Sequence, residues 1–370
     1  MILSNALLNG QTVDITINNG LIESVTPHSP CAADIDAHGL AVFPGLCNMH
    51  SHAPMVLFRG LGDDQPLDRW LNDYIWPAEQ GLTDERIHEG TLQACREMLA
   101  SGTTAFNDMY FHLPAMARAV EETGIRAMLG LNVFGDGDEL ADVENGKWCM
   151  ESTGQIRYSI APHSIYTVSK KGLLRSAEAC QRLGLPMHIH MNETRKEVDD
   201  CLREHGCRPW EYLDRLGILD MLGSNIIAAH CLHLSEHEIN LIGEHGITCV
   251  HCPNSNLKLG SGYRFPLLEL LEAGAKVALG TDGAASSNNL DMVEAMKTAA
   301  LLQKGWREDP TAVPAEQILR IATLGHTVAP GQPACLFLAP VRSVGDLVYA
   351  THGDQVAMTL VGGKVVYRNH

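Results

Sequence analysis

The sequence lacks the features that mark several classes of protein. No apolar run approaches the roughly eighteen residues that a membrane-spanning helix needs. No lysine or arginine precedes Arg59, so the positively charged region of a secretory signal is missing. Lysine and arginine number 27 against 44 acidic residues, which gives a formal charge of −17 with no basic stripe to offset it. We therefore expect neither a membrane nor a nucleic acid as a partner.

The cysteines do not form the pattern of a disulfide framework. Eleven cysteines in 370 residues is an odd count, and several of them lie inside apolar runs, which suits reduced thiols in a cytoplasm. Cys249-Val250-His251-Cys252 is formally a C-x-x-C motif with His230, His233 and His237 upstream. Because both cysteines fall within or just after an apolar run, we interpret them as core thiols rather than zinc ligands. The composition predicts a soluble, cytoplasmic enzyme.

The two ends of the chain read as short strands. Thr12–Ile17 alternates in polarity, Asn18-Asn19-Gly20 supplies a hairpin turn, and Leu21–Val25 returns. Similar runs near the C-terminus are Leu347–Ala350, Val356–Val361 and Lys364–Tyr367. Because neither end can bury much surface alone, we expect residues 1–43 and 333–370 to pair in one small β domain.

Between these ends, eight short apolar runs alternate with amphipathic stretches of helical length. The predicted strands are Ala41–Met49, Thr103–Met109, Ala127–Phe134, Arg157–Ala161, Pro186–Met191, Asn225–Ala229, Ile247–His251 and Lys276–Gly280. Helical patterns include Asp84–Ala100, Leu113–Thr123, Lys171–Leu183 and Ser235–Glu244. This count predicts an α/β fold, a (β/α)8 barrel over residues 44–332. A doubly wound open sheet is the alternative, but no Gly-rich phosphate loop follows the first strand.

Histidines and carboxylates gather at the predicted strand ends. In a barrel the C-terminal strand ends form the site, so these side chains should converge on one rim. Such convergence favours metal-assisted chemistry. The strand-end residues are His50, His52, Asn107, Asp108, Asn132, His163, His190, His230, His251 and Asp282.

Two H-x-H pairs stand out among these residues. His50 and His52 share one face of an extended chain, so both imidazoles can reach one ion, although the pattern alone is a weak signal. The second pair is His188 and His190. Only His190 lies near the mouth of the predicted barrel, and we expect His188 one layer further down inside it. Together with Asp282, the strand ends offer three imidazoles and a carboxylate, which suits a divalent first-row metal with one position left for water.

Several segments carry a resemblance to the amidohydrolase superfamily. Within it the chain resembles the 5′-methylthioadenosine/S-adenosylhomocysteine deaminase group, which includes 5′-deoxyadenosine deaminases. The match runs from about residue 40 to 325 in order and spacing. Its segments are Pro44–His52, Trp76–Glu79, Ala161–Ser164, His190–Thr194, His251–Asn256 and Gly280–Ser286.

The resemblance implies a hydrolytic deaminase that converts the 6-amino group of an adenosine derivative to the inosine analogue plus ammonia. It implies that Glu193 shuttles a proton to the purine ring and that His230 with Asp282 activates a metal-bound water. The implied substrate contacts are Glu79, at the ribose hydroxyls, with His163, Glu193, Ser286 and Trp76. The implied ligands of one divalent ion, usually zinc with iron or manganese as alternatives, are His50, His52, His190 and Asp282.

Departures from the family pattern refine this expectation. Two-metal relatives carry a lysine at the end of strand four, where this chain has His163, so one metal is expected and His230 stays free to act as a base. The loop Asn132–Leu140 is acidic, with no basic residue before Lys147. A neutral 5′ group therefore suits it better than the carboxylate of S-adenosylhomocysteine, which would want an arginine. The segment Thr327–Leu336 is shortened relative to the family.

Other functions stay open at this stage. Another mononuclear hydrolase of the superfamily, such as a guanine deaminase or an s-triazine chlorohydrolase, is the nearest alternative, and Glu79 favours a nucleoside over these. A metal-binding scaffold without catalysis would not need Glu193 and His230. We expect a homo-oligomer, and apolar residues such as Trp70 and Trp76 could line a subunit contact or cap the pocket.

Overall fold

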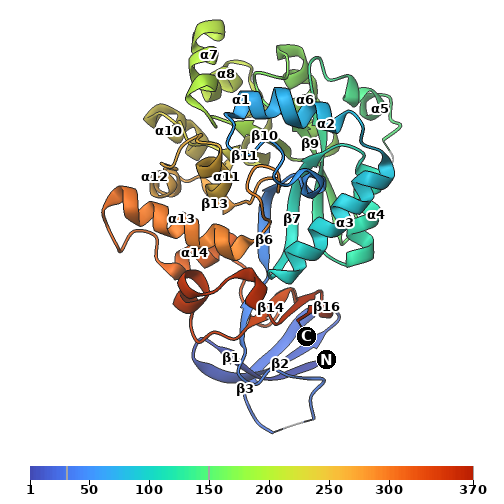
Figure 1. Cartoon of the computed structure of the whole chain (residues 1–370), viewed down its shortest axis with the longest axis vertical. Coiled ribbons are helices and arrows are strands. Elements are labelled where there is room, and N and C mark those ends of the chain that lie inside the picture. Colours follow the sequence, from blue (N-terminus) through green and yellow to red (C-terminus); the bar gives the residue numbers. More distant parts are fainter. Residues whose placement is uncertain (31, 149–150, 370) are drawn as a thin grey trace.

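The computed structural model describes residues 1–30, 32–148 and 151–369, which form two sheets and a set of covering helices (Figure 1). One sheet has eight parallel strands that follow the chain order from β6 to β13. Its strands are β6 (Leu46–Ser51), β7 (Thr103–Tyr110), β8 (Arg126–Val133), β9 (Ile156–Pro162), β10 (Met187–Met191), β11 (Ile226–His230), β12 (Thr248–His251) and β13 (Lys276–Leu279).

The first and last strands of this sheet meet through loop and side-chain hydrogen bonds. A Cβ on Gly280 would lie 2.8 Å from the backbone nitrogen of His50, so only glycine lets the two chain segments approach this closely. The Asp282 amide donates to the His50 carbonyl at 2.9 Å. Asn48 accepts from the Thr281 amide at 3.0 Å and donates to its hydroxyl at 2.7 Å. These contacts bring β6 and β13 together and nearly close the barrel.

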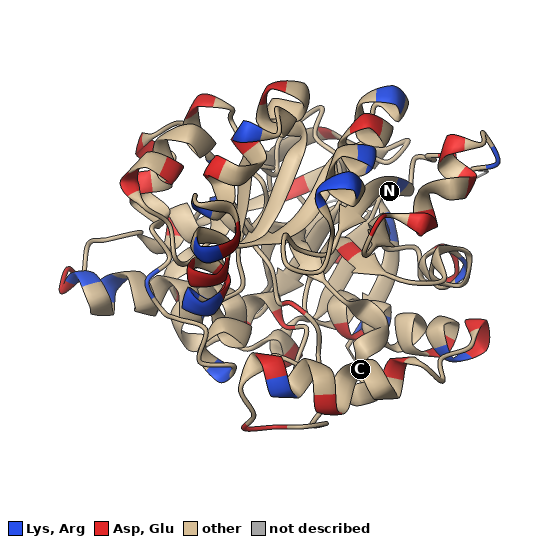
Figure 2. Cartoon of the chain, turned by 90° about the horizontal axis from the view of Figure 1, so that it is seen from above, with Lys and Arg blue, Asp and Glu red and all other residues tan. Residues whose placement is uncertain are grey.

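Amphipathic helices cover the outside of the barrel. In α3 (Asp84–Ala100), Thr83 caps the first turn, and the buried residues Ile87, Ala94 and Met98 recur on one face. Seen from above, charged residues lie mainly on the outer helices (Figure 2). The other main helices are α4 (Leu113–Thr123), α6 (Lys170–Leu183), α7 (Arg195–His205), α8 (Pro209–Arg215), α9 (Ile218–Leu222), α10 (Glu236–Glu244), α11 (Pro253–Lys258), α12 (Leu267–Glu272), α13 (Met292–Arg307) and α14 (Ala315–Ala322).

A separate mixed sheet is built from both chain ends, with the strand order β16-β15-β14-β5-β1-β2-β3 and β4 beside β1. Alternate residues of β14 join its core to the barrel. Leu336 and Leu338 pack in the core of the small sheet, whereas Phe337 packs in the barrel cluster and stacks on Phe43 at 5.2 Å. The strands are β1 (Ile2–Leu8), β2 (Gln11–Asn18), β3 (Leu21–Pro27), β4 (Ile35–Asp36), β5 (Ala41–Pro44), β14 (Leu336–Ala339), β15 (Met358–Val361) and β16 (Lys364–Arg368).

The predicted barrel with a small β domain from both ends is confirmed, with two local corrections. The run Ala41–Met49 is two strands in different sheets, because the chain turns at Gly45, where a Cβ would collide with Thr104. Leu347–Ala350 is a helical turn rather than a strand, since Ser343 accepts the Leu347 amide at 3.1 Å and starts the turn. The exact domain boundaries stay a prediction. No helix among the described residues has the length and apolar character needed to cross a membrane.

His251 does not converge with the other strand-end residues, which corrects the expectation from the sequence. It pairs with Leu279 across β12 and β13, one residue past the inward-facing Val250, so strand alternation turns it toward the helices. Its ring packs against Phe265 at 4.5 Å. Neither ring nitrogen has a hydrogen-bond partner among the described residues. His251 is therefore a buried, neutral core residue.

Replacing Phe337 with alanine should lower the free energy of unfolding by about 3–5 kcal/mol, because this fully buried ring joins the small sheet to the barrel. Urea unfolding followed by circular dichroism measures the loss. Leu301→Ala is the control, since that side chain is 50% exposed, and it should change the free energy by less than about 0.5 kcal/mol. A Phe337→Ala loss as small as the control would contradict this role.

His251 should make the fold sensitive to acid. Burial lowers its pKa from 6.5 to about 3. The unfolded chain therefore binds a proton first as the pH falls below 6.5, and stability drops between pH 6.5 and 3. From pH 7 to 5 the group removes about 2 kcal/mol of stability. The free energy of unfolding is measured at pH 7 and at pH 5 for the wild type and for His251→Leu. The decrease between the two pH values should be smaller in the variant by about 2 kcal/mol. An identical decrease in both proteins would show that His251 does not change its protonation on unfolding.

Candidate active site

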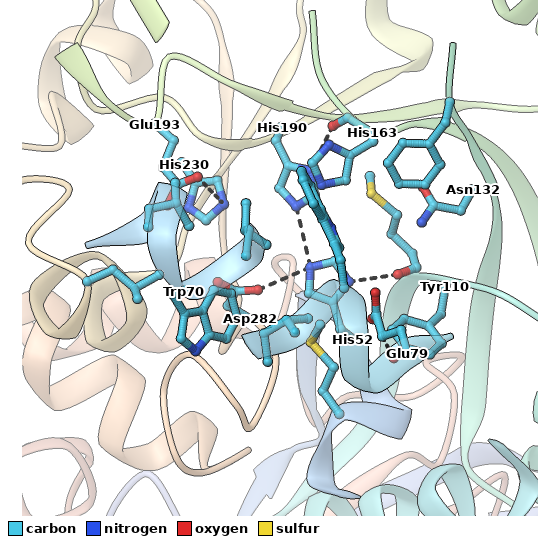
Figure 3. A pocket seen from close by; sticks show the side chains of 18 of the residues that line it. His52, Trp70, Glu79, Tyr110, Asn132, His163, His190, Glu193, His230 and Asp282 are labelled. Carbon is cyan, nitrogen blue, oxygen red and sulfur yellow. Dashed lines mark hydrogen bonds and ion pairs between the residues drawn. The ribbon is translucent and has the colours of Figure 1, made fainter. Parts of the chain in front are cut away.

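Four side chains meet at the C-terminal rim of the barrel, and three of them, His52, His190 and Asp282, are labelled in Figure 3. His50 ends β6, His52 follows it, His190 comes from β10, and Asp282 lies in the loop after β13. Asp282 Oδ1 lies 3.2 Å from Nε2 of His52 and 3.4 Å from Nε2 of His50. The Nε2 atoms of His52 and His190 are 3.4 Å apart. Four potential ligand atoms therefore face a common centre.

Hydrogen bonds fix which nitrogen two of these rings present. Nδ1 of His52 donates to the Met109 carbonyl, and Nδ1 of His190 donates to the His163 carbonyl, each at 2.7 Å. Because a carbonyl can only accept, Nδ1 carries a hydrogen in both rings, and Nε2 is the nitrogen that each ring presents to the centre. Nε2 of His50 is buried and has no hydrogen-bond partner among the described residues. A buried ring nitrogen that no hydrogen bond satisfies is what the ligand of a metal ion shows.

The arrangement fits a bound divalent metal. Ligand bonds of about 2.0–2.1 Å to one ion place neighbouring ligand atoms about 3–3.5 Å apart. The three separations given above, 3.2 Å, 3.4 Å and 3.4 Å, agree with this spacing. Two groups of metal-binding geometry share His50: one adds His52 and His190, and the other adds His230 and Asp282. Three imidazoles with a carboxylate suit zinc and other first-row metals. His230 thus lies at the edge of the same donor set.

Asp282 is held in place by two hydrogen-bond donors. Ser255 at the start of α11 donates to Oδ2 at 2.6 Å, and the Gly283 amide donates to Oδ1 at 2.7 Å. Burial alone would raise the pKa of this carboxyl, but hydrogen bonding and charge from His50 and His52 hold the pKa well below its usual range. The carboxylate is therefore ionised at neutral pH. Its φ of 64° is a left-handed conformation, a strain typical of functional sites.

Glu193 and His230 lie beside this group. His230 Nε2 is 3.8 Å from Glu193 Oε2, and Ser261 donates to Glu193 Oε1 at 3.0 Å. Burial raises the pKa of Glu193, which favours its protonated form. Strand alternation would point His230 outward together with Met191, its partner on β10, but its φ of 74° breaks the alternation. The ring stacks at 5.4 Å on His190 instead.

The opposite side of the site combines one carboxylate with aromatic side chains. Glu79 ends α2 (Trp76–Glu79) and accepts a 2.6 Å hydrogen bond from the Tyr110 hydroxyl. Burial raises the pKa of Glu79. Burial, followed by the charge of His52, lowers the pKa of His163 to about 3, so that ring is neutral. Phe134 stacks on His163 at 5.0 Å and on Phe111 at 6.1 Å.

These groups line one cavity at the rim of the barrel. The helical segment of residues 67–79, which contains α1 (Leu67–Arg69), η2 (Trp70–Ile75) and α2, forms one wall. Of the residues predicted from the sequence, Trp76, Glu79, His163, Glu193 and His230 line the cavity together with three of the four potential ligands, and His50 lies behind them. Ser286 does not line it. That side chain is buried and donates to the Gly283 carbonyl.

The sequence reasoning missed the residues that hold the functional side chains. Ser255 donates to Asp282, and the side-chain amide of Asn256 lies 2.9 Å from His230 Nδ1. Both residues lie in the segment His251–Asn256 that carries the family resemblance, but the sequence alone predicted no function for them. Tyr110 lies just after the strand-end pair Asn107 and Asp108. Its contribution to the site is the hydrogen bond that its hydroxyl donates to Glu79, which the sequence does not indicate. Ser261 lies in a glycine-rich loop that carries no sequence signal.

Known proteins resemble this chain over nearly its whole length. A 5′-deoxyadenosine deaminase of Methanothermobacter thermautotrophicus is 42% identical over 369 residues, covering 92% of this chain and 86% of the relative. A 5-methylthioadenosine/S-adenosylhomocysteine deaminase of Moorella thermoacetica is 40% identical, covering 95% and 89%.

Solved structures share the fold. An adenosine deaminase from Xanthomonas campestris with bound zinc has a TM-score of 0.90 and 33% identity, covering 98% of this chain and 92% of that one. A guanine deaminase from C. acetobutylicum is only 22% identical at a TM-score of 0.86, covering 99% of each chain, and it shares the fold alone. Residues 41–366 match the family model described as the amidohydrolase family. The chain belongs to the amidohydrolase family.

Proposed function

We propose that this protein is a hydrolytic deaminase of adenosine derivatives with a small neutral 5′ group, such as 5′-deoxyadenosine and 5′-methylthioadenosine. The reaction replaces the 6-amino group with oxygen and releases ammonia. The observation that carries the proposal is the set of imidazole and carboxylate atoms at metal-ligand spacing beside the buried Glu193 and His230 pair. The identity of 42% to a 5′-deoxyadenosine deaminase supports the substrate class.

Four residues would hold one divalent ion, most simply zinc: His50, His52, His190 and Asp282. When bound, such an ion supplies a hydroxide nucleophile at neutral pH. The zinc in the Xanthomonas campestris structure supports this choice of metal, and the presence of His163 in place of a lysine supports a single ion. Iron and manganese accept the same donors.

Glu193 and His230 would move the protons. Attack at C6 of adenine places charge on the ring nitrogens, so an acid must protonate the ring as the bond forms. Glu193 can hold that proton, because burial raises the pKa of its carboxyl. His230, with the ionised Asp282 beside it, would take the proton of the attacking water and pass it toward the leaving ammonia.

The other side of the cavity would hold the ribose and the 5′ group. Glu79, fixed by Tyr110, would accept hydrogen bonds from the ribose hydroxyls, while His163 and Trp76 contact the substrate. The stacked rings of Phe111 and Phe134 offer an apolar wall to the 5′ group. Among the described residues that line the cavity there is no lysine or arginine, which disfavours the carboxylate of S-adenosylhomocysteine. A contact from Ser286 stays a prediction.

We also propose a cytoplasmic location. Eight of the nine described cysteines are buried and all nine are free thiols, which suits a reducing compartment. Assembly into a homo-oligomer and the absence of a nucleic-acid partner remain predictions.

Ammonia release by the zinc-loaded protein tests the function. We expect 5′-deoxyadenosine and 5′-methylthioadenosine to have the highest kcat/KM, with S-adenosylhomocysteine, adenosine and guanine lower. If S-adenosylhomocysteine were the best substrate, the interpretation of the 5′ wall would be wrong. No turnover of any nucleoside with metal bound would move the function to another hydrolysis of the family.

His230→Asn should keep the metal and lose about 10²–10⁴-fold in kcat, since its imidazole is the proposed base. Metal content by atomic absorption and steady-state rates are the two measurements. His237→Asn, an exposed histidine on α10, is the matched control and should keep its rate. A near-normal kcat in His230→Asn would assign the base to another group.

Glu79→Gln should raise KM for nucleosides by about 10–100-fold with a much smaller change in kcat, because a charged hydrogen-bond acceptor is lost away from the reacting carbon. Steady-state kinetics with 5′-deoxyadenosine measures this effect. Glu121→Gln on the exposed face of α4 is the control. An unchanged KM would favour a free base or a triazine as substrate.

A further inference from the structure

One of the potential metal ligands is oriented differently from the other two histidines. His52 and His190 each donate Nδ1–H to a main-chain carbonyl. Nδ1 of His50 instead lies 2.9 Å from Nε2 of His188, and both rings are fully buried and nearly perpendicular. The orientation of His50 therefore depends on a side chain, which a substitution can remove.

His188 lies inside the barrel, where Asn107 of β7 contacts its ring. It pairs with Ile227, an inward-facing residue, one layer below His190 on β10. The amide nitrogen of Asn107 lies 3.2 Å from its Nδ1 and also donates to the Met49 carbonyl at 3.0 Å. Burial keeps the His188 ring neutral by lowering its pKa well below 6.5, and an interaction with the backbone of Asp108 opposes this shift, as a ring N–H that donates to a carbonyl does. With its hydrogen on Nδ1, directed to that backbone, His188 has its Nε2 lone pair free to accept from His50.

We propose that His188 is a positioning residue that accepts the Nδ1–H of His50 and thereby presents His50 Nε2 to the metal. The inference rests on the metal-binding part of the proposed function. A neutral imidazole that coordinates through Nε2 keeps its hydrogen on Nδ1, so the direction of this hydrogen bond is set once metal is bound. Without His188, that N–H would have no acceptor in a fully buried place. Loss of such outer partners costs about 10–100-fold in metal affinity.

Two substitutions at one position separate positioning from packing. His188→Leu removes the acceptor, whereas His188→Gln keeps an oxygen at the same reach along the side chain. Zinc affinity of the apoproteins is measured by competition with a chromophoric chelator, and the visible spectrum of the Co²⁺-loaded forms reports the ligand geometry. We expect His188→Leu to lose about 10–100-fold in zinc affinity with an altered Co²⁺ spectrum, and His188→Gln to stay within a few-fold of the wild type. His251→Leu, which removes a buried histidine that touches no ligand, should bind zinc normally.

The outcomes are distinct. A folded His188→Leu protein with wild-type zinc affinity overturns the proposal, and so do equal losses in the Leu and Gln variants, which would indicate packing alone. If the wild type binds zinc but deaminates no nucleoside, the proposed function fails while this inference stands. If the wild type binds no divalent metal, the inference falls with the metal site.

A measurement on the wild type covers the case in which His188→Leu does not fold. Neutron diffraction of the zinc-loaded protein locates the hydrogen between the two rings. A hydrogen on Nδ1 of His50 supports the proposal, and a hydrogen on Nε2 of His188 overturns it.

Discussion

The close contact between β6 and the loop after β13 is the constraint on which the site depends. Gly280 removes the side chain that would otherwise keep His50 away, and Asn48 with Thr281 ties the two segments by paired hydrogen bonds. The amide of Asp282 then binds the His50 carbonyl, which places the carboxylate against two imidazoles. Side chains more than two hundred positions apart come within ligand distance of one another because the barrel closes here.

Two buried carboxyl groups at this site have pKa values shifted in opposite directions, lowered for Asp282 and raised for Glu193. Burial acts on both in the same direction, toward the protonated form. Asp282 stays ionised because two imidazoles and two hydrogen-bond donors surround it. Glu193 has a single hydroxyl donor and a more distant His230, so its pKa remains raised. One environment suits a metal ligand and the other a proton carrier, the division that acid–base catalysis by paired groups requires.

The strand and helix positions were largely predictable because hydrophobic periodicity is local. α3 and α4 occupy the predicted ranges, and seven of the eight barrel strands lie within a few residues of the predicted ones. The two failures have different causes, one tertiary and one local. Nothing local in Ala41–Met49 says that Ala41–Pro44 pairs with β14 while Leu46–Ser51 pairs with β7. The apolar run at Leu347 has strand composition, but a serine three residues upstream of Asp346 starts a helical turn.

The sequence by itself determined the identity of the chemical groups: which strands end in histidine, which carboxylates accompany them, and the order that marks the family. Only the tertiary structure decided which of these groups meet. His251 and His230 both end neighbouring strands, yet alternation sends His251 toward the helices, while a positive φ turns His230 into the site. The tertiary structure also decided the hydrogen-bond partners of the potential ligands, such as His188 beside His50 and Ser255 beside Asp282. The physical reason is that direction and tautomer depend on hydrogen bonds between distant segments, and a local pattern does not contain them.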